Sequence, residues 1–208
     1  MTRPSTWRDE ADDFRDILGR LRRLELAQAG SHEVSNDAAF PLAPLNGRDF
    51  YYQLPGGGVW HFKFNSSTGL WDFVGGPPTS SIPSVGAWSG RSMSTYQALT
   101  AESGVAEPSI TVPFAGTYLV SFSGGGYSDV NGTSCYLGLS VNSATPSADA
   151  DAVVTVAAAN QIVGFHRNVP ATTFAKGDVL TLRGKGSGSG WGYFNRLSLA
   201  LTPISATP

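Results

Sequence analysis

Charged side chains are scarce in this chain of 208 residues. Lys and Arg number 14, Asp and Glu number 16, and together they make up 14% of the sequence, with a net charge of −2. Average soluble proteins contain about 25% charged residues. Proteins that bind nucleic acid usually present a strongly basic surface, which this composition does not supply. We therefore expect no nucleic-acid partner.

Cysteine and long apolar runs are also missing. The single cysteine, Cys135, excludes an internal disulfide framework and a thiolate zinc cluster, and we interpret it as a small core residue. No apolar run approaches the roughly 18 residues of a membrane helix. The first residues, Met-Thr-Arg-Pro, lead into an acidic segment, which is unlike a secretory signal. We expect synthesis in a cytoplasm and no membrane insertion.

Glycine, proline and aromatic residues are abundant instead. The chain has 25 Gly and 13 Pro, and 11% of its residues are aromatic. Disordered chains have few aromatic residues and high charge, so disorder is not expected. The composition favours a mainly β protein whose surface is partly covered in an assembly.

Residues 1–29 differ from the rest of the chain, because they hold 12 of its 30 charged residues. Ser5 or Thr6 can cap a helix there, and Gly30 can end it. An apolar stripe runs along this helix at spacings of three and four: Trp7, Ala11, Phe14, Ile17, Leu18, Leu21 and Leu24.

A helix of this length is marginal alone, so the stripe must be covered. It packs either on its own domain or, as we favour, in a coiled coil or as an anchor in a partner. Residues 30–48 support the second interpretation, because they show little periodicity, contain two prolines and predict a linker.

Residues 49–78 predict a short antiparallel β-meander. Three aromatic segments, 50–54, 59–64 and 70–74, are separated by Pro-Gly-Gly-Gly and Asn-Ser-Ser-Thr-Gly turns. A sheet this small cannot bury so many rings alone. The rings, with Trp60, Phe62, Trp71 and Phe73 among them, are expected to meet either symmetry mates or the next domain.

Residues 82–208 carry about eight short, regularly punctuated strand patterns. Alternation is clear at residues 135–141, where Cys135, Leu137, Leu139 and Val141 share one face. Strand signals at this spacing predict a β-sandwich or jelly roll.

Three segments of this part resemble the jelly-roll domains of the C1q and tumour-necrosis-factor-like family. Residues 116–122, Gly-Thr-Tyr-Leu-Val-Ser-Phe, are similar to its central Gly-x-Tyr-x-Phe-x-aromatic strand, with Val120 departing from the pattern. Residues 174–182 contain a late Lys-Gly-Asp strand, and residues 193–199 resemble the closing strand. The resemblance implies a C-terminal C1q/TNF-like jelly roll, a domain that commonly forms compact trimers.

The front half resembles minor tail and fibre proteins of actinobacterial phages. The similar residues are 60–65, Trp-His-Phe-Lys-Phe-Asn, and 71–78, Trp-Asp-Phe-Val-Gly-Gly-Pro-Pro. In that family an N-terminal helix precedes the aromatic stretch and a β domain follows it. The resemblance implies a virion structural protein made in the host cytoplasm. We expect a homotrimer whose helix docks on other virion proteins.

Motifs for catalysis are absent from the sequence. There is no G-x-S-x-G elbow, P-loop or G-x-G-x-x-G, and no carboxylate pair or nucleophile–base set can be named. We expect no enzyme activity and no cofactor.

The residues that could bind an ion are few and scattered. The three histidines, His32, His61 and His166, lie in separate segments, although His166 on a three-fold axis could hold a metal or an anion. Asp149 and Asp151, with Asp129 and Asn131, could offer oxygen ligands to calcium, but acids in polar loops are usually only solvated. We therefore expect no metal site.

Aromatic residues near glycine-rich loops are the candidate binding residues. Trp191 and Tyr193 follow Ser-Gly-Ser-Gly, and Tyr127 follows three glycines. Such rings can stack on sugars of a host cell-wall glycan, or pack at a trimer interface.

The sequence thus favours a homotrimeric tail or tail-tip protein with a possible host-adhesion role. A capsid head fibre or decoration protein is the first alternative. A stand-alone carbohydrate-binding module is the second.

Overall fold

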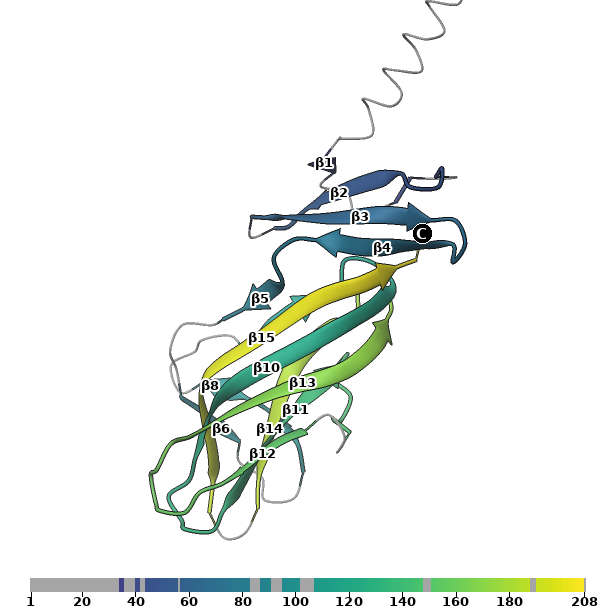
Figure 1. Cartoon of the computed structure of the whole chain (residues 1–208). Helices are drawn as coiled ribbons and strands as arrows, with labels where there is room; N and C mark the ends of the chain where they lie inside the picture. Colours follow the sequence, from purple (N-terminus) through teal and green to yellow (C-terminus); the bar gives the residue numbers. More distant parts are fainter. Residues whose placement is uncertain are drawn as a thin grey trace, which may run out of the picture.

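The described part of the protein is built from β-strands (Figure 1). In this computed structural model the described residues are 34–35, 40–41, 44–55, 57–82, 87–90, 95–101, 107–147, 151–187 and 190–207. No helix occurs among them, so the prediction of a mainly β protein is confirmed. The predicted helix of residues 1–29, with Trp7, Phe14, Leu18, Leu21 and Leu24, lies outside these residues.

Two groups of strands follow one another along the chain. The first group contains five short strands, of which β2 to β4 are rich in aromatic residues: β1 (Val34–Ser35), β2 (Asp49–Gln53), β3 (Val59–Asn65), β4 (Leu70–Gly75) and β5 (Thr79–Ser81). The second begins with short strands: β6 (Ala87–Gly90), β7 (Gln97–Ala98), β8 (Thr100–Ala101) and β9 (Ser109–Thr111). It continues with six longer strands: β10 (Gly116–Tyr127), β11 (Ser134–Val141), β12 (Asp151–Thr155), β13 (Val163–Phe174), β14 (Val179–Gly186) and β15 (Gly192–Ala206).

The strands form two sheets. The larger has the order β1-β2-β3-β4-β15-β10-β13, with β5 and β6 paired to other stretches of β15 and β8 paired to β6. The smaller has the order β12-β11-β14-β7, with β9 also on β14. Every pairing between the described strands is antiparallel except that of β1 with β2.

Alternating side chains form the core between the two sheets. On β10, Tyr118, Val120 and Phe122 are buried, whereas the residues between them are partly or largely exposed. The smaller sheet contributes buried leucines from β11 and β14, and Cys135 is also fully buried. Period-two alternation of this kind places one face of each strand on the core and the other toward solvent. The prediction of Cys135 as a core residue is confirmed.

The meander of β2, β3 and β4 continues the larger sheet (Figure 1). Trp71 and Asp72 of β4 pair with Ala206 and Ser205 at the end of β15. The strands of residues 49–78 therefore share a hydrogen-bonded sheet with β15 and β10, although about 130 residues separate β4 from the end of β15 in sequence.

An aromatic cluster fills the junction between the meander and the strands from β9 onward. The Phe40 ring stacks on Trp71 at 5.0 Å and lies 4.4 Å from the Phe114 ring, which in turn lies 4.8 Å from Tyr52. The Trp60 ring also reaches Tyr118 of β10, at 6.4 Å. Of the two expectations for the meander's rings, contact with the next domain is the one observed. Part of the predicted linker belongs here too, because Gly47 donates to the Phe64 carbonyl and Phe64 donates to the Arg48 carbonyl, each at 2.8 Å.

Candidate functional site

Two of the three predicted binding residues, Tyr127 and Tyr193, are neighbours at the end of the two packed sheets that lies away from the meander. Tyr127 ends β10 and pairs in register with Tyr193 near the start of β15. Their rings are stacked, with centroids 4.9 Å apart and planes 15° apart. Both side chains are partly exposed. The pairing follows from cross-strand register, since residues directly opposite in antiparallel strands bring their side chains together.

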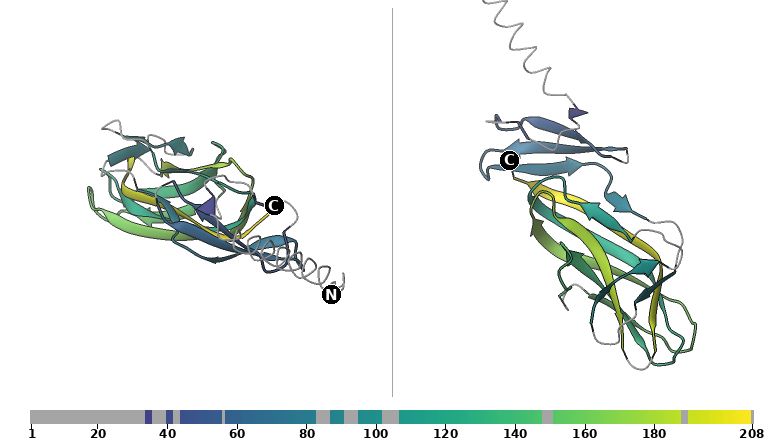
Figure 2. Two further views of the ribbon diagram at one scale, coloured as in Figure 1. Left: turned by 90° about the horizontal axis from the view of Figure 1, so that it is seen from above. Right: turned by 180° about the vertical axis from the view of Figure 1, so that it is seen from behind.

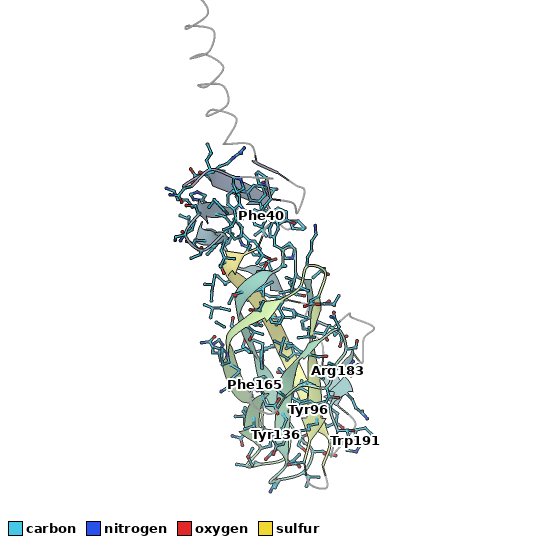
Figure 3. The ribbon with its side chains drawn as sticks, turned by 90° about the vertical axis from the view of Figure 1, so that its right-hand side faces the viewer. Phe40, Tyr96, Tyr136, Phe165, Arg183 and Trp191 are labelled. Carbon is cyan, nitrogen blue, oxygen red and sulfur yellow. The ribbon has the colours of Figure 1, made fainter. Side chains whose placement is uncertain are left out.

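Trp191 lies at the same end of the molecule, remote from Phe40 (Figure 3). This residue is 44% exposed. Its backbone N–H donates to Asp129 Oδ1 at 3.2 Å, which ties it to the β10–β11 loop. The ring is therefore presented to solvent from an anchored backbone.

The loops that carry these rings are held together by backbone contacts. Ser187 donates to the Ser134 carbonyl at 2.9 Å, and Ser134 donates back to Ser187 Oγ at 3.2 Å. Gly190 allows the close approach, because a Cβ there would lie 2.5 Å from Ser128 Oγ and 2.6 Å from Thr133 Oγ1. The described backbone at Ser134 and Ser187 is thus held in place, and binding to a preformed site has a lower entropic cost.

The predicted ion-binding residues do not converge. Asp129 accepts from Trp191 and from Ser128, and Asp151 accepts from the Tyr96 hydroxyl. His61 lies 2.7 Å from Asp49 and stacks on Tyr51. Within the described segments, no three His, Cys, Asp or Glu side chains are grouped as a metal would require. His32 and Asp149 lie outside those segments.

His166 borders an open hollow on the outer face of the larger sheet. Gly164 of β13 leaves open space above the sheet, whereas its partner Gly125 of β10 lies beneath Asn195, which with Arg196 forms the other side of the hollow. The His166 side chain is exposed, and its Nε2 lies 3.0 Å from Asn168 Oδ1.

Sequence reasoning missed a cluster on the smaller sheet. Lys185 Nζ lies over two rings, 4.4 Å from the centroid of Tyr96 and 4.7 Å from that of Tyr136. Burial, and then the hydrogen bond to Asp151, raise the pKa of Tyr96. Figure 3 shows Tyr96 and Tyr136 on the same side of the molecule. The cluster links four separate segments, and we interpret it as a structural fastening of β12 and residues 95–101 to the sheet.

Sequence reasoning also missed a cleft at the opposite end. It has a volume of about 440 Å³ and is lined by residues from the β2–β3 turn, the β4–β5 connection and β9. No sequence pattern marks it, because its walls come from segments between residues 52 and 113 that show no common periodicity.

The chain matches no known family model and no curated protein sequence. Among the described residues there is also no helix long and apolar enough to cross a membrane.

Proposed function

We propose that the protein is a structural component of a phage virion, a homotrimeric tail or tail-tip protein. The observation that carries this proposal is the strand order. β5 and β6 pair with different stretches of β15 and count here as one strand, and β7 and β9 both pair with β14 and count as another. With β10 to β15 this gives eight strands, which in chain order run 1-8-3-6 in one sheet and 2-7-4-5 in the other; β8, which pairs with β6, is not counted. Two interlocked Greek keys of this kind characterise jelly rolls, the architecture of many viral capsid domains. The order supports the C1q/TNF-like resemblance of residues 116–122, 174–182 and 193–199.

The outer face of the larger sheet supports self-association. Its central positions are uncharged and mostly small: Thr117, Leu119, Ser121, Ser123, Asn168, Thr173, Ser198, Ala200 and Thr202. Two of its cross-strand pairs are joined by hydroxyl groups, at 2.7 Å between Ser123 and Ser198 and at 3.3 Å between Thr117 and Thr173. This central part of the face, away from His166 and Arg196, carries no charged side chain, so another copy can cover it with little desolvation cost.

The mass in solution tests the trimer. Light scattering should give three times 21.9 kDa, about 66 kDa. Leu119→Arg, in the middle of the uncharged face, should yield a folded monomer. The matched control is Val153→Arg on the other sheet, since Val153 is 54% exposed and Leu119 is 48% exposed. A wild-type monomer of about 22 kDa at micromolar concentration, or an L119R trimer, would contradict the proposed assembly.

Incorporation into particles tests the anchor. Leu18→Asp together with Leu21→Asp should leave a soluble protein and virions that lack it, because two charges replace apolar residues of the predicted stripe. Normal incorporation would place the anchor elsewhere. Imaging of labelled virions separates a tail position from a head-fibre or decoration position.

A carbohydrate-binding role is the second candidate. The stacked Tyr127 and Tyr193 rings at strand ends and the exposed Trp191 ring favour it, since exposed rings on a fixed backbone suit sugar stacking. In a virion these rings would face the host cell wall. Binding of the full chain to host cell walls, measured beside Trp191→Ala and Tyr127→Ala, tests this role.

A further inference from the structure

The cleft at the junction of the meander and the sandwich has the dimensions of a small-molecule site. Its volume of about 440 Å³ falls within the range of typical ligand pockets, roughly 300–1,000 Å³. Thr79 and Ser80 of β5 line it. Figure 1, and Figure 2 from behind, show β5 after the connection by which the chain leaves the meander. The distal rings of Trp191, Tyr127 and Tyr193 do not line it.

The floor of the cleft is apolar and buried. Tyr52, Leu54, Trp60 and Ile110 form it, and none of the four is more than 6% exposed. Three proline rings, Pro55, Pro78 and Pro113, add apolar walls.

Hydrogen bonds fix the geometry of this floor. Trp60 Nε1 donates to the Pro77 carbonyl at 2.7 Å, and Leu54 donates to the Gly58 carbonyl at 3.1 Å. Gly76, with φ of +138°, permits the turn, because a Cβ there would lie 2.4 Å from the Val59 carbonyl oxygen. The cleft is preformed, so a ligand would not have to order it.

Hydroxyl and backbone groups line the rim. Thr79, Ser80, Ser109 and Thr111 lie there. The Ser109 N–H donates to Ser81 Oγ of β5 at 3.1 Å, whereas the Val112 N–H donates to Asp178 at the start of β14. Backbone groups alternate in direction along a strand, so those of Thr111 point to the β5 side, as those of Ser109 do.

The lining contains no charged side chain, and this decides the class of ligand. Its twelve residues are apolar, hydroxyl-bearing or glycine. Burial also raises the pKa of Tyr52, so its hydroxyl stays neutral at physiological pH. An ionic ligand would lose its hydration without gaining a counter-charge, which is costly. A sugar ring suits the cleft, since it combines an apolar C–H face with hydroxyl groups around its edge.

An extended peptide fits less well. Adding a strand requires a free sheet edge, but β9 has only three residues. Pro108 and Pro113 bracket it and offer no backbone N–H. The edge is too short to hold a peptide by main-chain hydrogen bonds.

We infer that this cleft, between the β2–β3 turn, the β4–β5 connection and β9, binds an uncharged saccharide. The sugar's apolar face lies on the proline rings Pro55, Pro78 and Pro113, above the buried Tyr52 and Trp60 rings, and its hydroxyls bond to the Ser and Thr rim. This site is separate from the distal rings and does not depend on the virion role.

Titration with neutral sugars tests the site on the full chain. Glucose, galactose, mannose, N-acetylglucosamine and lactose serve as probes at millimolar concentrations, with glucuronate as the charged counterpart of glucose and a Pro-Ser repeat peptide as the rival ligand. The indole N–H of Trp60, followed by ¹H–¹⁵N NMR, should shift with at least one neutral sugar and not with glucuronate or the peptide.

Variants locate the binding. Thr111→Trp, which fills the cleft, should weaken it at least about tenfold. Thr155→Trp, an equally exposed strand threonine on β12, should leave it unchanged. Thr111→Val keeps the shape but removes the hydroxyl and should weaken binding several-fold, which preserves the test if the bulkier change unfolds the chain.

Several results would overturn the inference. They are no shift with any neutral sugar, an equal response to glucuronate, binding of the peptide instead, or binding that survives Thr111→Trp in a folded protein. Trp191→Ala separates the two proposed sites, because it should reduce cell-wall binding by more than tenfold and leave the response of Trp60 intact.

Discussion

At the scale of single residues, buried polar groups determine the stability of the protein, the pH dependence of that stability and the reactivity of its thiol. Tyr118 is fully buried, and its hydroxyl donates to the Phe114 carbonyl at 2.8 Å. Tyr118→Phe should lower the free energy of unfolding by about 1–3 kcal/mol, because it leaves that carbonyl without its donor. Urea unfolding measures the change. Tyr136→Phe, at a partly exposed position on the other sheet, serves as the control and should change it by less than about 0.5 kcal/mol.

The same burial predicts a loss of stability at alkaline pH. Burial raises the pKa values of Tyr52 and Tyr118 in the folded state. In the unfolded chain these tyrosines lose their protons near pH 10. Above that pH the unfolded state binds fewer protons than the folded state, so stability falls as pH rises, whereas below it these groups contribute no pH dependence.

Melting temperatures between pH 8 and 11.5 measure this slope, which starts near the unfolded pKa of about 10. Tyr118→Phe should flatten it, since one proton fewer is involved. An unchanged slope in that variant would show that Tyr118 titrates alike in both states.

Cys135 should be inert in the folded protein. Burial raises the pKa of its thiol to about 11, and the side chain is fully inaccessible. Thiol reagents react with the thiolate, so at pH 8 the native protein should not be modified, while the urea-unfolded chain should react with one equivalent. Rapid modification of the native protein would mean that β10 and β11 separate often.

At the scale of strands, Phe114 is the residue that joins the meander to the sandwich. Its ring meets Phe40 and Tyr52 at centroid distances of 4.4 and 4.8 Å. Phe114→Ala should cost about 3–5 kcal/mol. Calorimetry should still show one transition, because β4 and β15 share a sheet. Ile204→Ala, at a 41% exposed position of β15, is the control. Two separate transitions in the wild type would contradict a shared core.

The strands were more predictable from the sequence than their partners. Residues 59–64 alternate, and β3 spans Val59–Asn65; the Asn-Ser-Ser-Thr-Gly turn likewise places the start of β4 correctly. Local periodicity determines such segments. It does not determine that Trp71 lies beside Ala206, since this register depends on packing between distant segments.

The candidate binding residues were likewise predictable from the sequence only in part. The pairing of Tyr127 with Tyr193 joins two residues that were both singled out in the sequence. The cleft around Tyr52 and Thr111 was not found, because its walls are ordinary strand and turn residues until the fold brings them together.

At the scale of the whole molecule, the two candidate binding regions lie at opposite ends (Figure 3). Phe40 marks the end that bears the meander, and Trp191 marks the other. Weak sugar contacts at the distal end would gain avidity from three copies on one axis. Trp191→Ala should therefore reduce cell-wall binding of the trimer by more than tenfold, measured by sedimentation with walls. Retained binding in both Trp191→Ala and Tyr127→Ala would remove these rings from the site.

The central position of β15 has a consequence for how quickly the protein can form. β15 pairs with β4, β5, β6 and β10, and its partners in β4 lie about 135 residues away in sequence. The entropic cost of closing such long loops precedes the contacts that stabilise them, so refolding should take milliseconds to seconds. Until β15 docks, β10 and β4 each present an unpaired edge that another chain can occupy. Crowded nascent chains would thus be most prone to aggregation just before this strand is inserted.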